Sequence, residues 1–166
     1  YRFAIYSQKE YAKKLNIPWG ISESAFSLQD LNYNYQYKAF GIPWLGLKRG
    51  LKEDVVVSPY ASILTLEKNY KDVINNIDEF KKINAYDKFG FYESVDFTPS
   101  RVKKEKNLEI VKTYMAHHQG LILLSINNFL NNKILQKRFI ENPEIKAVEI
   151  LLKEKIPQTA AYTKEK

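Results

Sequence analysis

The sequence predicts an all-α fold in which helices are separated by long, ordered loops. Over most of the chain, apolar residues recur at the three- and four-residue spacing of amphipathic helices. Two segments, 17–50 and 84–108, lack a sustained helical period and contain most of the glycines and prolines. No apolar run approaches the roughly 20 residues that a membrane-spanning helix needs, so we expect no membrane segment in this chain.

The N-terminal part is expected to be a helix followed by a long loop. Residues 8–15 have the apolar spacing of a helix, and Pro18 should end it near Asn16. Segment 17–50 should then form a loop with short extended pieces, one of them indicated by tyrosines at alternate positions in 33–37. A loop this long inside a domain usually carries function.

Two helices and a hairpin are expected in the middle of the chain. Ser58 as N-cap and Pro59 at the first position predict a helix over 59–67. An apolar stripe predicts a second helix over 70–83. Within 84–108, alternating apolar residues predict a short β-hairpin; they are Phe89, Phe91, Val95 and Phe97.

The longest helix is expected at 109–131, where apolar residues cover an arc wide enough to imply burial on more than one side. A shorter helix should follow at 134–140, and Pro143 should open another. The last residues are polar. We therefore expect one domain over 1–157 and a polar tail over 158–166.

Composition disfavours several classes of function. The net charge of +7 comes almost entirely from lysines dispersed among acidic residues, whereas base and phosphate recognition favour arginine. A basic helical nucleic-acid-binding protein is therefore a less favoured alternative. Cysteine is absent, which removes disulfides and thiolate ligands and fits a reducing, cytoplasmic compartment. Neither a phosphate-binding glycine loop nor a GxSxG nucleophile elbow is present.

Two acidic residues lie among aromatic residues rather than among lysines. They are Glu23 in WGISESAF and Glu93 in FGFYESVDF, in a chain that is 14% aromatic. Aromatic faces suit sugar rings, and loss of hydration raises a carboxyl pKa. Such a carboxyl group can protonate a glycosidic oxygen while a second carboxylate attacks or activates water. The structural alternative is that Glu23 caps a turn and Glu93 pairs with a lysine or with Arg101.

The only histidines, His117 and His118, are adjacent within a predicted helix. Neighbouring helical side chains point about 100° apart, so we expect no metal site and no cofactor. Two readings stay open. One histidine could pack in the core with its ring hydrogen-bonded, or one could face a cleft, where it would bind sugar hydroxyls or orient a carboxylate.

Several segments together resemble the glycoamylase-like domain. This domain forms the central part of cyclic β-1,2-glucan synthases and of proteins labelled glucoamylase-like or cellobiose-phosphorylase-like. The segments follow one another within about residues 17–157; they are WGISESAF, YQYKAFGIPWLGLKRGL, VVVSPYASIL, GFYESVDFTPSR and YMAHHQG.

The resemblance implies a fold, an activity and a site. The fold would be a partial α/α toroid of helical hairpins, with this chain as the C-terminal part of the domain. The activity would be cleavage and religation, or hydrolysis, of β-1,2-glucan, with Glu23 and Glu93 as catalytic acids in undecided roles. Matching motif positions would bind sugar; they are Trp19, Tyr35, Gln36, Tyr37, Lys48, Arg49, Asp96, Arg101, His117, His118 and Gln119.

The partners implied by the resemblance are a β-glucan oligosaccharide or polysaccharide and the remainder of a larger polypeptide. The chain would then be a cytoplasmic, soluble part of a membrane-associated synthase. Helix faces left without their neighbouring hairpins would be able to promote self-association. A non-catalytic carbohydrate-binding module remains the second hypothesis, since it needs the aromatic residues but no pair of acids.

Overall fold

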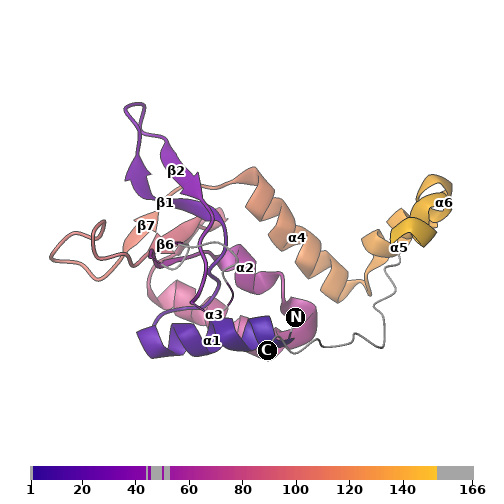
Figure 1. Ribbon diagram of the computed structural model, residues 1–166, viewed down its shortest axis with the longest axis horizontal. Coiled ribbons are helices and arrows are strands. Elements are labelled where there is room, and N and C mark those ends of the chain that lie inside the picture. The colour runs from indigo at the N-terminus through magenta and orange to yellow at the C-terminus, as the bar shows by residue number, and fades with distance from the viewer. Residues whose placement is uncertain (1, 44, 46–49, 51–52, 153–166) are drawn as a thin grey trace, which may run out of the picture.

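Helices form most of the secondary structure in a computed structural model that describes residues 2–43, 45, 50 and 53–152. They are α1 (Arg2–Leu15), α2 (Pro59–Ile63), α3 (Leu66–Lys82), α4 (Ala116–Leu130), α5 (Ile134–Glu141) and α6 (Pro143–Leu152). α1 and α3 lie side by side, and α4 runs away from the strands towards α5 and α6 at the far end (Figure 1). Within the described ranges, no helix has the length and apolar character needed to cross a bilayer.

An apolar cluster joins α1 to α4. Burial of each large apolar side chain contributes about 1.5–3 kcal/mol, and aromatic and branched aliphatic side chains dominate here. The buried members are Ala12, Trp19, Tyr60, Ile63, Leu66, Val73 and Ile122. α2 begins at Pro59, as expected, but the Ser58 side chain does not cap it. The Ser58 hydroxyl instead donates a hydrogen bond of 2.5 Å to the carbonyl oxygen of Glu93.

Short antiparallel strands form three small sheets at the other end of the molecule (Figure 1). β1 (Ser24–Gln29) pairs with β2 (Tyr35–Lys38), and β4 (Tyr86–Asp87) pairs with β5 (Gly90–Phe91). In the third sheet, β6 (Ser94–Asp96) lies between β3 (Val56–Val57) and β7 (Glu109–Val111). A second apolar cluster lies among them; it comprises Ile21, Phe26, Phe40, Ile42, Val56, Val57, Phe80, Ala85 and Val95.

The segment between α1 and β1 is fixed tightly at Trp19 and Gly20. The buried amide of Asn76 on α3 accepts a hydrogen bond of 2.9 Å from the Trp19 backbone N–H and donates one of 2.8 Å to the Trp19 carbonyl. Gly20 has a φ of +133°, and a Cβ there would lie 2.7 Å from the Ser58 carbonyl oxygen. Glycine is therefore needed both for the backbone conformation and for the close approach. This anchoring sets the position of Glu23, three residues further on.

The structure agrees with the expected mainly helical fold but corrects two of the predicted elements. The fold is mainly helical, but three antiparallel sheets accompany the helices. The helix expected at 109–131 begins only at Ala116, because 109–111 is β7, paired with β6. The hairpin expected at 89–97 is split: β4 and β5 form it, whereas β6 pairs with β3 and β7. In both cases partners distant in sequence outweigh the local pattern.

Other sequence expectations hold with shifted bounds. The expected loop over 17–50 contains the extended pieces β1 and β2. The two helices predicted between residues 59 and 83 appear as α2 and α3, and the non-helical backbone of Asn69 makes a kink inside α3. The first helix begins earlier than predicted, at Arg2.

Candidate functional site

A buried carboxylate–imidazole pair lies where the strands meet α4. Glu93 directly precedes β6, and His118 lies in the first turn of α4. The Nδ1 atom of His118 is 2.8 Å and 3.0 Å from the two carboxylate oxygens of Glu93. The backbone N–H of Ala25 on β1 donates to the same carboxylate at 3.2 Å. Two segments distant in sequence, β1 and α4, thus converge on Glu93, whose side chain is excluded from solvent.

The His118 ring is stacked on one face and hydrogen-bonded firmly at Nδ1, with a longer contact at Nε2. Tyr60 from α2 stacks on it with ring centroids 3.7 Å apart and an interplanar angle of 15°. The Tyr60 hydroxyl donates to the Glu23 carbonyl and to Ser22 Oγ, each at 3.0 Å. The hydroxyl of Tyr37, on β2, lies 3.4 Å from His118 Nε2. His118 therefore lies between Glu93 at its Nδ1 side and two other residues, Tyr37 on β2 and Glu23 before β1.

Glu23 is the exposed acid of the site. Its carboxylate lies close to both histidines: one ligand atom from each of Glu23, His117 and His118 falls within 4.8 Å of the others. Among the described residues, no lysine or arginine forms an ion pair with Glu23. Burial, assisted by the negative charge of Glu23, raises the pKa of Tyr37 to about 12, so the Tyr37 hydroxyl keeps its proton at neutral pH.

The two predicted acids therefore both lie close to His118 but in different environments. Glu93 does not pair with a lysine or with Arg101, as the structural alternative supposed; it pairs with His118. The two open readings of the histidines apply to different residues. His118 is 1% exposed and hydrogen-bonded in the core, whereas His117 is exposed beside Glu23.

Asp96 and Arg101 form a separate network beneath β1. Arg101 Nε donates to Asp96 at 2.6 Å, and Arg101 Nη1 donates to Asp54 at 2.7 Å. The fully buried Asp96 also accepts the backbone N–H groups of Ser27 and Thr98 at 3.0 Å and 2.9 Å. Burial by itself would raise the pKa of Asp54, but hydrogen bonds from Lys38 and Arg101 outweigh it and hold that pKa below its usual value. These contacts tie loops together and are compatible with a structural role.

The remaining predicted sugar-binding positions are scattered. Trp19 is buried in the helical cluster. Gln119 donates to the Phe91 carbonyl at 3.0 Å, and Gln36 is exposed on β2. Tyr35 lines a surface hollow. The two basic predictions, Lys48 and Arg49, fall outside the described residues.

A hollow of about 500 Å³ opens beside Tyr37. Aromatic rings and amide groups from β1, β2 and the turn between them line it, together with Lys112 before α4; the rings and amides are Gln29, Tyr33, Asn34, Tyr35 and Tyr37. Rings that stack on apolar sugar faces, next to amides that bind hydroxyl groups, are a combination suited to carbohydrate. Tyr37 connects this hollow to His118.

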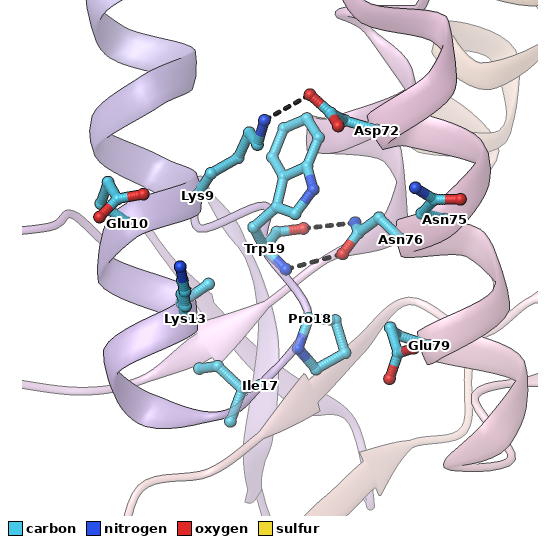
Figure 2. A pocket seen from close by; sticks show the side chains of 11 residues that line it. Lys9, Glu10, Lys13, Ile17, Pro18, Trp19, Asp72, Asn75, Asn76 and Glu79 are labelled. Carbon is cyan, nitrogen blue, oxygen red and sulfur yellow. Dashed lines mark hydrogen bonds and ion pairs between the residues drawn. The ribbon is translucent and has the colours of Figure 1, made fainter.

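A second pocket, of about 400 Å³, lies between α1 and α3. Figure 2 shows the paired hydrogen bonds of Trp19 with Asn76 and the ion pair of Lys9 with Asp72. None of the residues around Glu93 lines this pocket. It is a junction between two helices and the loop after α1, and its residues stabilise that loop.

Sequence reasoning missed Tyr60. Local spacing in SPYAS predicts only a helix start, although a tyrosine two residues into such a start can point back towards the preceding loop. The stacking of Tyr60 on His118 depends on how α2 meets α4, which local spacing does not reveal.

Comparisons with known proteins show the family of the chain. The family model described as "Glycoamylase: Putative glucoamylase" matches residues 1–143. The chain belongs to the glycoamylase family. It is 40% identical over 154 residues to the cyclic beta-(1,2)-glucan synthase NdvB of Rhizobium meliloti, covering 93% of this chain and 5% of that protein. The glycoamylase-family chain thus spans a small fraction of the length of this curated relative.

Solved structures share the fold of this glycoamylase-family chain. An endo-beta-1,2-glucanase from Chitinophaga pinensis, in complex with sophorotriose and glucose, matches with a TM-score of 0.56 and 19% identity, over 89% of this chain and 33% of that one. A protein described like the family, from Bacteroides fragilis, matches with a TM-score of 0.55 and 20% identity over 80% and 27%. A similar protein from Bacteroides caccae gives 0.53 and 21% over 78% and 26%.

Proposed function

We propose that this chain acts on β-1,2-linked glucan and that Glu23 and Glu93 supply the carboxyl groups for the reaction. The observation that carries the proposal is the placement of two acids around His118, one exposed and one buried, beside a hollow lined with tyrosines. The curated relative is a cyclic β-1,2-glucan synthase, and one structural relative is an endo-β-1,2-glucanase. Both point to the same substrate class.

The proposed chemistry needs one proton donor and one carboxylate. A carboxylic acid protonates the glycosidic oxygen as the bond to the anomeric carbon breaks, and the second carboxylate attacks that carbon or takes a proton from the attacking water. Glu23 is accessible to a sugar, and no described cation neutralises it. Glu93 is held by His118, whose Nδ1 atom lies 2.8 Å from its carboxylate.

We further propose that the chain works as one part of a longer polypeptide forming an α/α toroid. It covers only 26–33% of the solved relatives. α4–α6 expose large apolar side chains that a neighbouring helical hairpin would cover, or that would drive self-association if left open; the most exposed are Leu123, Leu130, Phe139 and Leu151.

The test compares Glu23→Gln and Glu93→Gln in the complete polypeptide that contains this chain. Each substitution keeps the side-chain volume and removes the acid, so each should lower turnover of linear β-1,2-glucan by at least a hundredfold. Product analysis by proton NMR then separates retention from inversion at the anomeric carbon. Normal rates in both variants would show that these acids do not carry the reaction.

A non-catalytic carbohydrate-binding module is the second candidate, favoured by the burial of Glu93 and its bond to His118. It predicts that the intact polypeptide binds β-1,2-glucan without turning it over. Binding would then survive Glu23→Gln and Glu93→Gln but weaken when Tyr35 is changed to alanine, because stacking on the ring would be lost.

A further inference from the structure

We propose that Glu23, His117 and His118 bind a late first-row transition-metal dication such as Zn²⁺. Their ligand atoms lie within 4.8 Å of one another, and they come from two segments distant in sequence, the turn before β1 and the first turn of α4. Two imidazoles and a carboxylate suit Zn²⁺ or Cu²⁺, whereas Mg²⁺ and Ca²⁺ prefer oxygen ligands alone.

His118 is already arranged as a metal ligand. Nδ1 faces the Glu93 carboxylate at 2.8 Å, so in the neutral ring Nδ1–H donates to that carboxylate and the lone pair is left on Nε2. A carboxylate behind the imidazole is the usual outer partner of a metal-binding histidine, since it fixes the tautomer and raises ligand basicity. The stacked Tyr60 ring prevents His118 from rotating away.

The contact between the Tyr37 hydroxyl and His118 Nε2 is weak enough for a metal to replace it. The Tyr37 hydroxyl lies 3.4 Å from Nε2, a long hydrogen bond, and Tyr37 is 42% exposed, so its ring has space to move. His118 is thus a side chain 99% buried whose outward nitrogen has no strong partner among the described residues.

The other two ligands can close on a metal without moving the backbone. Zinc bonds of about 2.0–2.2 Å place tetrahedral ligand atoms roughly 3.3–3.5 Å apart. Closing from 4.8 Å needs a shift of the order of 1–1.5 Å, which rotation of the exposed Glu23 and His117 side chains can supply. Adjacent residues in a helix have Cβ atoms that point in different directions. The rings of His117 and His118 nevertheless come close together, with centroids 5.4 Å apart. Adjacent helical histidines led us to expect no metal site, and the short separation of these two rings is the observation that supports the present proposal instead.

Charge also favours a dication. Glu23 and Glu93 bring two carboxylates to the site, and neither forms an ion pair with a lysine or arginine among the described residues. A bound metal would engage Glu23 and so compete with glucan. That consequence rests on the proposed function, whereas metal binding itself does not.

The experiment titrates the purified, metal-free chain with ZnSO₄ by isothermal calorimetry, with MgCl₂ as comparison and Co²⁺ absorbance as a second readout. We expect one Zn²⁺ per chain with micromolar or tighter affinity, no saturable Mg²⁺ binding, and visible Co²⁺ bands typical of low coordination. Glu23→Gln and His117→Ala should each weaken Zn²⁺ binding at least tenfold. Both side chains are exposed, so neither variant should unfold.

Glu105→Gln, at an exposed acid in the loop before β7, is the matched control and should leave Zn²⁺ affinity unchanged. The proposal is overturned if Zn²⁺ fails to saturate the chain, or if both His117→Ala and Glu23→Gln bind it as tightly as the parent. The two proposals can fail independently. If the chain binds Zn²⁺ but the complete polypeptide does not turn over glucan, the metal site stands and the catalytic proposal is rejected.

Discussion

Replacing Glu93 with alanine should lower the free energy of unfolding by about 3–5 kcal/mol, because a buried carboxylate is removed and its two donors lose their acceptor. The side chains of His118 and Glu93 are 2% and 0% exposed, respectively, so water cannot replace the lost contacts. A hydrogen bond to a charged group contributes about 1.5–3 kcal/mol. Leaving His118 Nδ1–H and the Ala25 N–H without their acceptor adds about 1–3 kcal/mol. A domain of ordinary stability, about 5–15 kcal/mol, remains folded after this loss.

The assay is a double-mutant cycle of Glu93→Ala, His118→Ala and the double variant, measured by urea unfolding. Because the two side chains are in direct contact, we expect a coupling energy of about 2–3 kcal/mol. Glu105→Ala, a change at an exposed acid, should stay within about 0.5 kcal/mol of the parent. A loss below about 1 kcal/mol for Glu93→Ala, or a coupling energy near zero, would refute the buried pair.

Three further perturbations examine the framework around the site. Asn76→Ala should cost about 2–4 kcal/mol in urea unfolding, because two buried main-chain groups lose their partners; a cost under about 0.5 kcal/mol would contradict that. Gly20→Ala should cost more than about 2 kcal/mol, since its Cβ would meet the Ser58 carbonyl at 2.7 Å in a positive-φ conformation, and an unchanged midpoint would reject this close approach. The folded pKa of Asp54 is lowered, so its stabilising contribution is present above the unfolded value of about 3.9 and is lost as pH falls through the folded value. Arg101→Met should therefore reduce the loss of unfolding free energy between pH 7 and pH 3. An equal loss in the variant and the parent would show that Arg101 does not lower the pKa of Asp54.

Local patterns predicted the helical elements best where one face of a helix is buried along its length. The stripe around Val73 and Phe80 gave α3, and Pro59 marked the start of α2. The pattern failed at Ile110 and Val111, where apolar spacing fits a helix but pairing with Val95 and Ser94 makes a strand. Hydrogen bonding to a strand distant in sequence contributes more there than local propensity does.

The site was predicted in part. Glu23 and Glu93 were selected because they lie among aromatic residues, and the structure brings them to the same histidine. Asp96 and Arg101 belong to the same motif, yet they form a buried network with Asp54. The difference lies in their partners, because Asp96 within β6 contacts Arg101 and the Ser27 N–H, whereas Glu93 precedes the strand and reaches His118 on α4.

The sequence by itself determined the helical periods, the glycine and proline positions that divide them, the lack of thiol chemistry, and the family motifs. Only the tertiary structure decided that His118 is the partner of Glu93, that Tyr60 covers it, and that Glu23 and His117 face it from the exposed side. The reason is physical. Periodicity fixes which face of an element is apolar, whereas the pairing of buried polar groups depends on contacts between segments tens of residues apart, where each unpaired group would cost free energy.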